Sequence, residues 1–229
     1  MYFSLILLAI CLFIFLFVIF LCTRDDFVLL RRNIAQEQVF NIAILSLLFG
    51  LLTARLFYAL IHSSEGFFHP LVFLAFPYFP GFSTIGGVIG TFIFLFFYTT
   101  KRTIPTLRLF DFFSLAFIPS LFIGFSYLSI RGLSLLMPIL YLIVGVIFLI
   151  FLIPRHRKGE LKDGSVFYLF LISFAIISLL TDFISKSSKI IFLFGTEGII
   201  SIIVLISCLV LLIKQENLHE IGNKLWNRK

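Results

Sequence analysis

Charged residues inside long apolar segments are the positions at which this sequence could do chemistry. On insertion scales an arginine at the middle of a bilayer costs roughly 2.5–3.5 kcal/mol, so such a residue tends to face protein or a wet cavity. Arg55, in LLTARLFYAL, lies well inside an apolar segment over residues 37–61. Two interpretations are open. Either Arg55 faces protein or a cavity, or its side chain snorkels along the helix towards the membrane surface.

A second group of polar residues gathers near the ends of other apolar segments. Asp182 precedes Lys186 by four positions, the spacing at which two side chains pair on one helix face. Glu197, in GTEGII, would either cap the first turn of the last segment or line a cavity. Together with Arg131 and Lys189, these residues form the polar constellation that we expect at one membrane surface, and Arg131 and Asp182 are its candidate catalytic residues.

Other polar or small residues favour structural roles. Asp111 lies near the predicted start of a segment over 109–129, where the helix dipole favours a carboxylate. Gly86, Gly87 and Gly90, in STIGGVIG, form a small-residue stripe with the GxxxG spacing that permits close helix packing.

Cysteine and histidine give no sign of a metal or a cofactor. The three cysteines (Cys11, Cys22 and Cys208) lie in or beside apolar segments, and no pair has metal-ligand spacing. None of the four histidines has a neighbour at the spacing of a metal site or a catalytic triad. We therefore expect no metal and no cofactor.

The elements that must position these residues are membrane helices. Of the 229 residues, 61% are apolar and only 13% are charged, whereas soluble domains are about 25% charged. The apolar runs are continuous, not alternating, and backbone amides in lipid must be satisfied within their own segment, which favours helices. The sequence therefore predicts an all-α integral membrane protein that forms a single polytopic domain over residues 1–229.

We expect about seven transmembrane helices, each near the ~20 residues that cross a bilayer. The first run has neither the basic start nor the small-residue cleavage site of a signal peptide, so we expect it to remain in the mature protein. The predicted spans lie near residues 2–22, 37–61, 84–100, 109–129, 133–153, 164–184 and 195–213.

Loop charges predict the orientation. One set of loops holds fourteen of the eighteen Lys and Arg residues, in clusters at 24–32, 101–108, 155–162 and 214–229. The opposite set holds Arg131, Lys186 and Lys189. The positive-inside rule then places the N-terminus outside and the C-terminus in the cytoplasm. It also explains the net charge of +7, so we exclude a nucleic-acid partner.

Two stretches outside the spans have alternative interpretations. Residues 62–83 contain many aromatic residues but no Lys or Arg, which is typical either of an aromatic belt at the interface or of a re-entrant element beside a lipid-entry cleft. The basic stretch 214–229, with Trp226, is typical of a helix on the cytoplasmic surface.

Over roughly residues 28–213 the sequence resembles the prolipoprotein diacylglyceryl transferases of bacterial inner membranes. The order and spacing of several motifs carry the resemblance. They are the ARxxY pattern at 54–58, HPLVFLAF at 69–76, GFSTIGGVIG at 81–90, KRTIPTLRLFDFF at 101–113, the segment 164–184 and GTEG at 195–198.

The resemblance implies a multi-pass protein of the bacterial plasma membrane that moves a diacylglyceryl group from phosphatidylglycerol to the lipobox cysteine of a prolipoprotein. It also implies substrate-binding roles for Arg55, Tyr58, Gly86, Gly87 and Glu197. Such a reaction needs an activated thiol and a cationic site for the departing phosphate, which arginine suits because its fork bonds two oxygens.

Several positions depart from the family's pattern. The family's histidine before Gly-Gly falls on Ile85, two arginines fall on Phe125 and Ser178, and an asparagine falls on Leu128. Arg131 is a candidate to substitute for one of these arginines from a displaced position. The alternative hypothesis is therefore a catalytically diverged member, a possible pseudoenzyme, that binds lipid or lipoprotein in the membrane without turnover.

Overall fold

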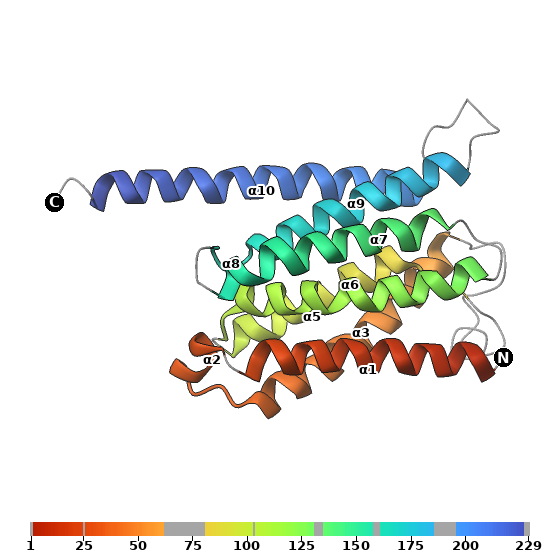
Figure 1. Ribbon diagram of the computed structural model, residues 1–229, viewed down its shortest axis with the longest axis horizontal. Helices are drawn as coiled ribbons and strands as arrows, with labels where there is room; N and C mark the ends of the chain where they lie inside the picture. The colour runs from red at the N-terminus through yellow and green to blue at the C-terminus, as the bar shows by residue number, and fades with distance from the viewer. Residues whose placement is uncertain are drawn as a thin grey trace. The chain divides into compact units, whose positions relative to one another are not determined.

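The computed structural model describes residues 2–24, 26–61, 81–102, 104–130, 135–157, 161–185 and 196–226. Within these ranges, the side chains of 2–5, 156–157, 182, 184–185, 196–197 and 215–226 lie outside the description. Every regular element of the described chain is a helix (Figure 1). The predicted all-α fold is confirmed.

The helices coincide closely with the predicted segments. Each of the seven predicted segments contains a helix. In chain order the elements are α1 (Tyr2–Arg24), α2 (Phe27–Arg31), α3 (Gln36–Ile61), α5 (Thr84–Lys101), α6 (Thr106–Ile130), α7 (Leu136–Ile147), the π-helical turn η2 (Phe148–Leu152), α8 (Ile153–Arg157), α9 (Ser165–Ser185) and α10 (Thr196–Trp226).

Five stretches of the described chain are long and apolar enough to cross a membrane: Ile6–Arg24, Gln36–Ile61, Thr84–Lys101, Thr106–Ile130 and Leu136–Arg155. Shorter apolar helices lie at Ser165–Thr181 and Gly198–Lys214, within α9 and α10. The structure therefore contains several membrane helices. Their exposed faces are rich in large apolar side chains such as Leu48, Leu52 and Leu56 of α3, as a lipid-facing surface requires.

The chain divides into two compact units, Met1–Gly145 and Val146–Lys229. In the first unit, α3 packs along α5, α1 packs along α6, and α1 and α5 also contact α3 and α6, respectively (Figure 1). In the second unit, α9 and α10 pack against each other. The functional residues that the structure describes in most detail lie in the first unit.

The glycine stripe explains why α3 and α5 approach so closely. A Cβ added at Gly86 would lie 2.5 Å from Cβ of Phe57 and 3.0 Å from the carbonyl oxygen of Thr53. At Gly90 it would overlap the side chain of Thr53, and at Gly87 it would lie 3.3 Å from Cβ of Ala54. The predicted packing role of this stripe is confirmed.

The expectation for Asp111 rested on the wrong helix boundary. Helix α6 begins at Thr106, three residues before the predicted start, and its first turn contains no acidic residue. Asp111 is instead fully buried in the interior of the first unit. A dipole contact at a helix start therefore does not explain this carboxylate, because the effect falls off within the first turn.

Candidate functional site

The best-defined polar site in the first unit is the place where residues 54–58 of α3 meet residues 81–86 at the start of α5. We call it the arginine junction. It brings together the ARxxY pattern and the GFSTIGG run, which are 26 residues apart between Arg55 and Gly81. Both segments carry the family resemblance described above.

Arg55 is the centre of this junction. Its side chain is only 3% exposed, and its Nη1 donates a hydrogen bond of 2.7 Å to the carbonyl oxygen of Gly81. The guanidinium carbon lies 5.8 Å from the centroid of the Phe82 ring, within the range of a cation–π interaction. Arg55 therefore faces protein, as one of the two interpretations predicted, and it does not snorkel to the surface.

Two hydrogen bonds of Ser83 also hold the segment that leads into α5. The backbone N–H of Ser83 donates to the carbonyl oxygen of Ala54 at 3.0 Å. The hydroxyl of Ser83 accepts from the backbone N–H of Gly86 at 3.3 Å, which caps the first turn of α5. The chain entering α5 is thus bonded to α3 at two successive residues, Ala54 and Arg55.

Tyr58 and Gly81 make the junction tight. A Cβ added at Gly81 would clash with the ring of Tyr58, since it would lie within 2.6 Å of three ring carbons. Only a glycine lets the chain pass this ring so closely, and the ring in turn limits how Gly81 presents its carbonyl oxygen to Arg55. The family resemblance singled out Tyr58, Gly86 and Gly87, and the structure places all three at or beside this junction.

The junction is built to orient groups and to supply positive charge. Its described side chains offer a guanidinium and three hydroxyls, on Tyr58, Ser83 and Thr84. None of these is a base that would take a proton from a thiol near neutral pH. The arrangement can therefore position an anionic or polar substrate, but thiol activation requires a group from elsewhere.

Two of the residues at the family's chemistry-bearing positions, Ile85 and Phe125, are apolar side chains. Ile85 is buried, with 4% of its surface exposed. Phe125 stacks face to face on Tyr141 of α7, with ring centroids 5.3 Å apart and ring planes 4° from parallel. An aromatic pair thus fills the position where the family pattern has an arginine.

The remaining candidates are not brought together in the described structure. Arg131 lies outside the described residues, as do Lys186 and Lys189. Asp182 lies on α9 and Glu197 on the first turn of α10, but their side chains are outside the description. Most of the predicted outer loop, residues 62–80, is also outside it. The polar constellation predicted for these residues stays a prediction.

Sequence reasoning missed two contacts of the first unit. One is the pairing of Gly81 and Ser83 with α3: the predicted start at residue 84 agrees with α5, which Ser83 caps, but no local pattern links this segment to α3. The other is the ion pair between Arg108 and Asp26, at the opposite end of the same unit, with a 2.7 Å contact between Nη2 and Oδ2. These two residues are 82 positions apart, and no local pattern links them.

Comparison with known proteins places the junction in a family. The family model for prolipoprotein diacylglyceryl transferase matches residues 1–125, which include α1, α3, α5 and most of α6. A search of curated proteins finds no match to the chain. Because the family match spans more than half of the 229 residues and covers both halves of the arginine junction, the chain belongs to the prolipoprotein diacylglyceryl transferase family.

Proposed function

We propose that this protein transfers a diacylglyceryl group from phosphatidylglycerol to the lipobox cysteine of a secreted prolipoprotein. In this reaction the thiol sulfur forms a bond to the glycerol carbon of the lipid, and the bond from that carbon to the phosphate oxygen breaks. The products are a thioether and glycerol phosphate, which carries away the electron pair of the broken bond. A base must remove the thiol proton, and cations must balance the charge on the departing phosphate.

The arginine junction is the observation that supports this proposal. It retains the family's ARxxY and Gly-Gly positions and builds from them a buried cation, bonded at 2.7 Å to Gly81, at the entrance to α5. We assign Arg55, Tyr58, Gly86 and Gly87 to positioning the substrate lipid, and Glu197 to the same substrate from the start of α10. Arg131 and Asp182 are the proposed catalytic residues, with Arg131 facing the phosphate.

The proposal includes a topology. Seven crossings, with α9 and α10 as the sixth and seventh, put the N-terminus outside and the C-terminus in the cytoplasm of a bacterial plasma membrane. The arginine junction then lies near the outer surface, where a secreted prolipoprotein presents its cysteine. The basic ends of α1, α2 and α5 lie on the cytoplasmic side.

A second candidate function is lipid or lipoprotein binding without turnover. The stack of Phe125 on Tyr141 favours it, because an aromatic pair at this position cannot stabilise a departing phosphate as an arginine does. Burial of Ile85 points the same way, since an aliphatic side chain can neither donate nor accept a proton. In this case the membrane scaffold would present a substrate to another protein.

Complementation separates the two functions. The chain is expressed in bacterial cells depleted of their own transferase, and the lipobox cysteine of a reporter prolipoprotein is analysed by mass spectrometry. Thioether-linked diacylglycerol is expected. Its absence at normal membrane levels of the protein would overturn the transferase proposal, and co-purification of unmodified prolipoprotein or phosphatidylglycerol would then support the binding function.

Matched variants test the assignment of Arg131. Arg131→Ala should abolish lipidation, because the phosphate would lose its proposed cation, whereas Lys189→Ala removes a charge from the same predicted side of the membrane and should leave lipidation unchanged. Full activity of Arg131→Ala would exclude Arg131 as the displaced arginine.

A further inference from the structure

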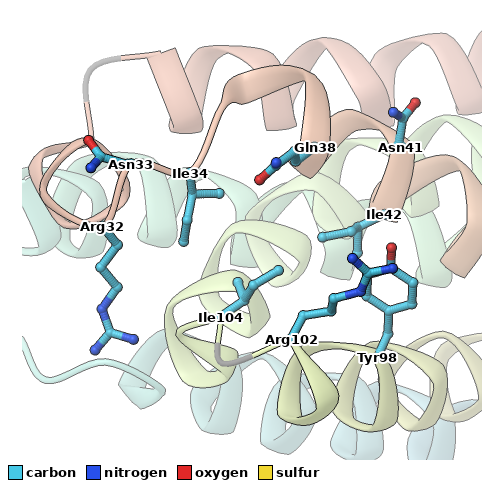
Figure 2. A pocket seen from close by; sticks show the side chains of 9 residues that line it. All are labelled: Arg32, Asn33, Ile34, Gln38, Asn41, Ile42, Tyr98, Arg102 and Ile104. Atoms are coloured by element: carbon cyan, nitrogen blue, oxygen red, sulfur yellow. The ribbon is translucent and has the colours of Figure 1, made fainter.

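A polar cavity lies at the end of the first unit opposite to the arginine junction. The proposed transfer reaction does not use this cavity. We call it the basic pocket. It has a volume of about 360 Å³ and is formed by the end of α2, the start of α3 and the end of α5 (Figure 2). The polar residues that line it are Arg32, Asn33, Gln38, Asn41, Tyr98 and Arg102.

Two similar chain reversals frame the pocket. After α2 the chain reads Arg32-Asn33-Ile34, and the backbone N–H of Ile34 donates back to the carbonyl oxygen of Leu29 at 3.0 Å. After α5 the backbone N–H of Ile104 donates back in the same way to Thr99, at 3.1 Å. Asn33 has the left-handed φ of 53° that such a helix stop requires. Each reversal places one arginine directly after a helix end.

Both arginines line the pocket, each from the residue that follows a helix end. Arg32 and Arg102 lie on opposite sides of it, and Gln38 points from α3 towards the space between them (Figure 2). The guanidinium carbon of Arg102 lies 5.8 Å from the centroid of the Tyr98 ring, which helps to orient it. Arginine forks and side-chain amides are the donors that recognise phosphate oxygens.

The charge balance at this end favours an anion. No acidic residue lines the pocket. Asp26, at the same end, is engaged by Arg108, whose Nε and Nη2 donate to it at 3.0 and 2.7 Å. Some of the last carbonyl groups, which would repel an anion, accept the backbone bonds of the two reversals: those of Val28, Leu29 and Leu30 in α2 and that of Thr99 in α5. The two arginines are thus the charged side chains among the described residues that line the pocket.

The surroundings indicate that the anion belongs to a lipid. The pocket lies where α3 begins and α5 ends, at the level at which membrane helices meet lipid headgroups. The short helix α2 beside it exposes Phe27 and Leu30, which are 85% and 60% exposed, as an interfacial helix does when its apolar side chains enter the acyl boundary. Ile34 and Ile104 supply apolar walls. Basic pockets between transmembrane helices on the cytoplasmic side are suited to phospholipid headgroups.

We propose that the basic pocket binds the phosphate of an anionic phospholipid from the leaflet opposite to the arginine junction, with Arg32 and Arg102 as the two phosphate ligands. This is a binding site separate from the transfer reaction. It would hold the first unit at a fixed depth in the membrane. The proposal of this binding site does not depend on whether the protein is an active transferase.

The test uses the full-length protein purified in a neutral detergent, so that no membrane surface potential contributes. Native mass spectrometry counts the lipids bound during titration with phosphatidylglycerol or with phosphatidylcholine of the same chains. The pocket variant is Arg32→Gln/Arg102→Gln. The control is Arg31→Gln/Lys101→Gln, which removes the same charge from exposed neighbours that do not line the pocket.

The wild type and the control should each bind one more phosphatidylglycerol than the pocket variant does over the same titration. For that lipid, the pocket variant should bind at least about tenfold more weakly, because two charge-assisted contacts are lost. Phosphatidylcholine should occupy the site less, since its choline cation opposes the arginines. Thermal unfolding of the variants checks that each is folded.

Three results would overturn the proposal. One is equal phosphatidylglycerol binding by the folded pocket variant and the control. Another is equal occupancy by phosphatidylcholine in the wild type. The third is displacement of the bound lipid by an equimolar concentration of soluble glycerol phosphate, which would assign the pocket to a free phosphate compound. Because the readout is binding and not lipidation, failure of the transferase proposal leaves this test intact.

Discussion

The two ends of the first unit use arginine in opposite ways. At the arginine junction, Arg55 is buried and donates to the backbone of Gly81, so the side chain holds two parts of the chain together. At the basic pocket, Arg32 and Arg102 are exposed residues that follow helix ends and line a cavity. The same guanidinium group is fixed to the backbone at one end and lines an open cavity at the other.

The difference follows from burial. A guanidinium inside apolar surroundings must satisfy its donors with protein, as the backbone carbonyl of Gly81 does for Arg55 at 2.7 Å. A guanidinium at the membrane surface can satisfy its donors with water or a lipid phosphate as well as with protein. This comparison predicts that variants at the two ends will separate stability from binding.

The largest loss of stability is expected from breaking the packing beneath the arginine junction. Gly86→Ala would force a Cβ to within 2.5 Å of Phe57 and 3.0 Å of a backbone oxygen, neither of which is the end of a flexible side chain. We expect a loss of about 2–3 kcal/mol, the upper part of the usual range for overpacking. Thermal unfolding in detergent measures it.

Gly124→Ala is the matched control. Its added Cβ would lie 3.9 Å from the sulfur of Cys11, an ordinary contact, so α6 should accept it without loss. If both variants unfold at the same temperature, the close approach of α3 and α5 is not what holds the junction.

The second largest loss of stability is expected from replacing the buried arginine, Arg55. Arg55→Met keeps an apolar stem but leaves the carbonyl oxygen of Gly81 without this donor, and we expect a loss of about 1.5 kcal/mol, typical of a hydrogen bond to a charged group. Arg55→Lys should lose less, since an ammonium can still reach an acceptor. Arg102→Met, at the other end, should change stability by less than about 0.5 kcal/mol. Equal stability of Arg55→Met and wild type would show that the junction does not depend on this bond.

The sequence predicted the helices because each span is a continuous apolar run. It left open whether Arg55 faces protein or snorkels to the surface, because both avoid the cost of a charge in lipid. It could not predict the acceptor, since Gly81 comes to Arg55 only through the packing of α5 on α3. The basic pocket was missed for the same reason: its two arginines belong to turns 70 positions apart. Even Asp111 was misassigned, because a boundary wrong by three residues moves a carboxylate out of the first helical turn.

The third effect tests a structural arginine at the basic end. Arg108 donates from Nε and Nη2 to one oxygen of Asp26, while the other oxygen of Asp26 accepts from the backbone N–H groups of Val28 and Leu29, both at 3.0 Å. Asp26→Asn keeps an acceptor for this cap, so the cycle of Asp26→Asn and Arg108→Gln isolates the ion pair. We expect a coupling energy of about 1 kcal/mol, since Arg108 is partly exposed.

Thermal unfolding of the four proteins at low and high salt gives this coupling. It should fall only slightly with salt, because the pair is mostly buried. A coupling near zero would mean that Asp26 acts on α2 alone, as its cap.

The smallest change in stability is expected where the change in binding is largest. Arg32 is exposed and follows the end of α2, so Arg32→Gln should leave thermal unfolding within about 0.5 kcal/mol of wild type. The same variant should lose phosphatidylglycerol at the basic pocket, because one of the two proposed phosphate ligands is gone. Arg55→Met should show the reverse, with reduced stability and an unchanged number of lipids at that pocket. If Arg32→Gln destabilises the protein as much as Arg55→Met does, then Arg32 also stabilises the fold. The two ends would then not differ in how their arginines affect stability.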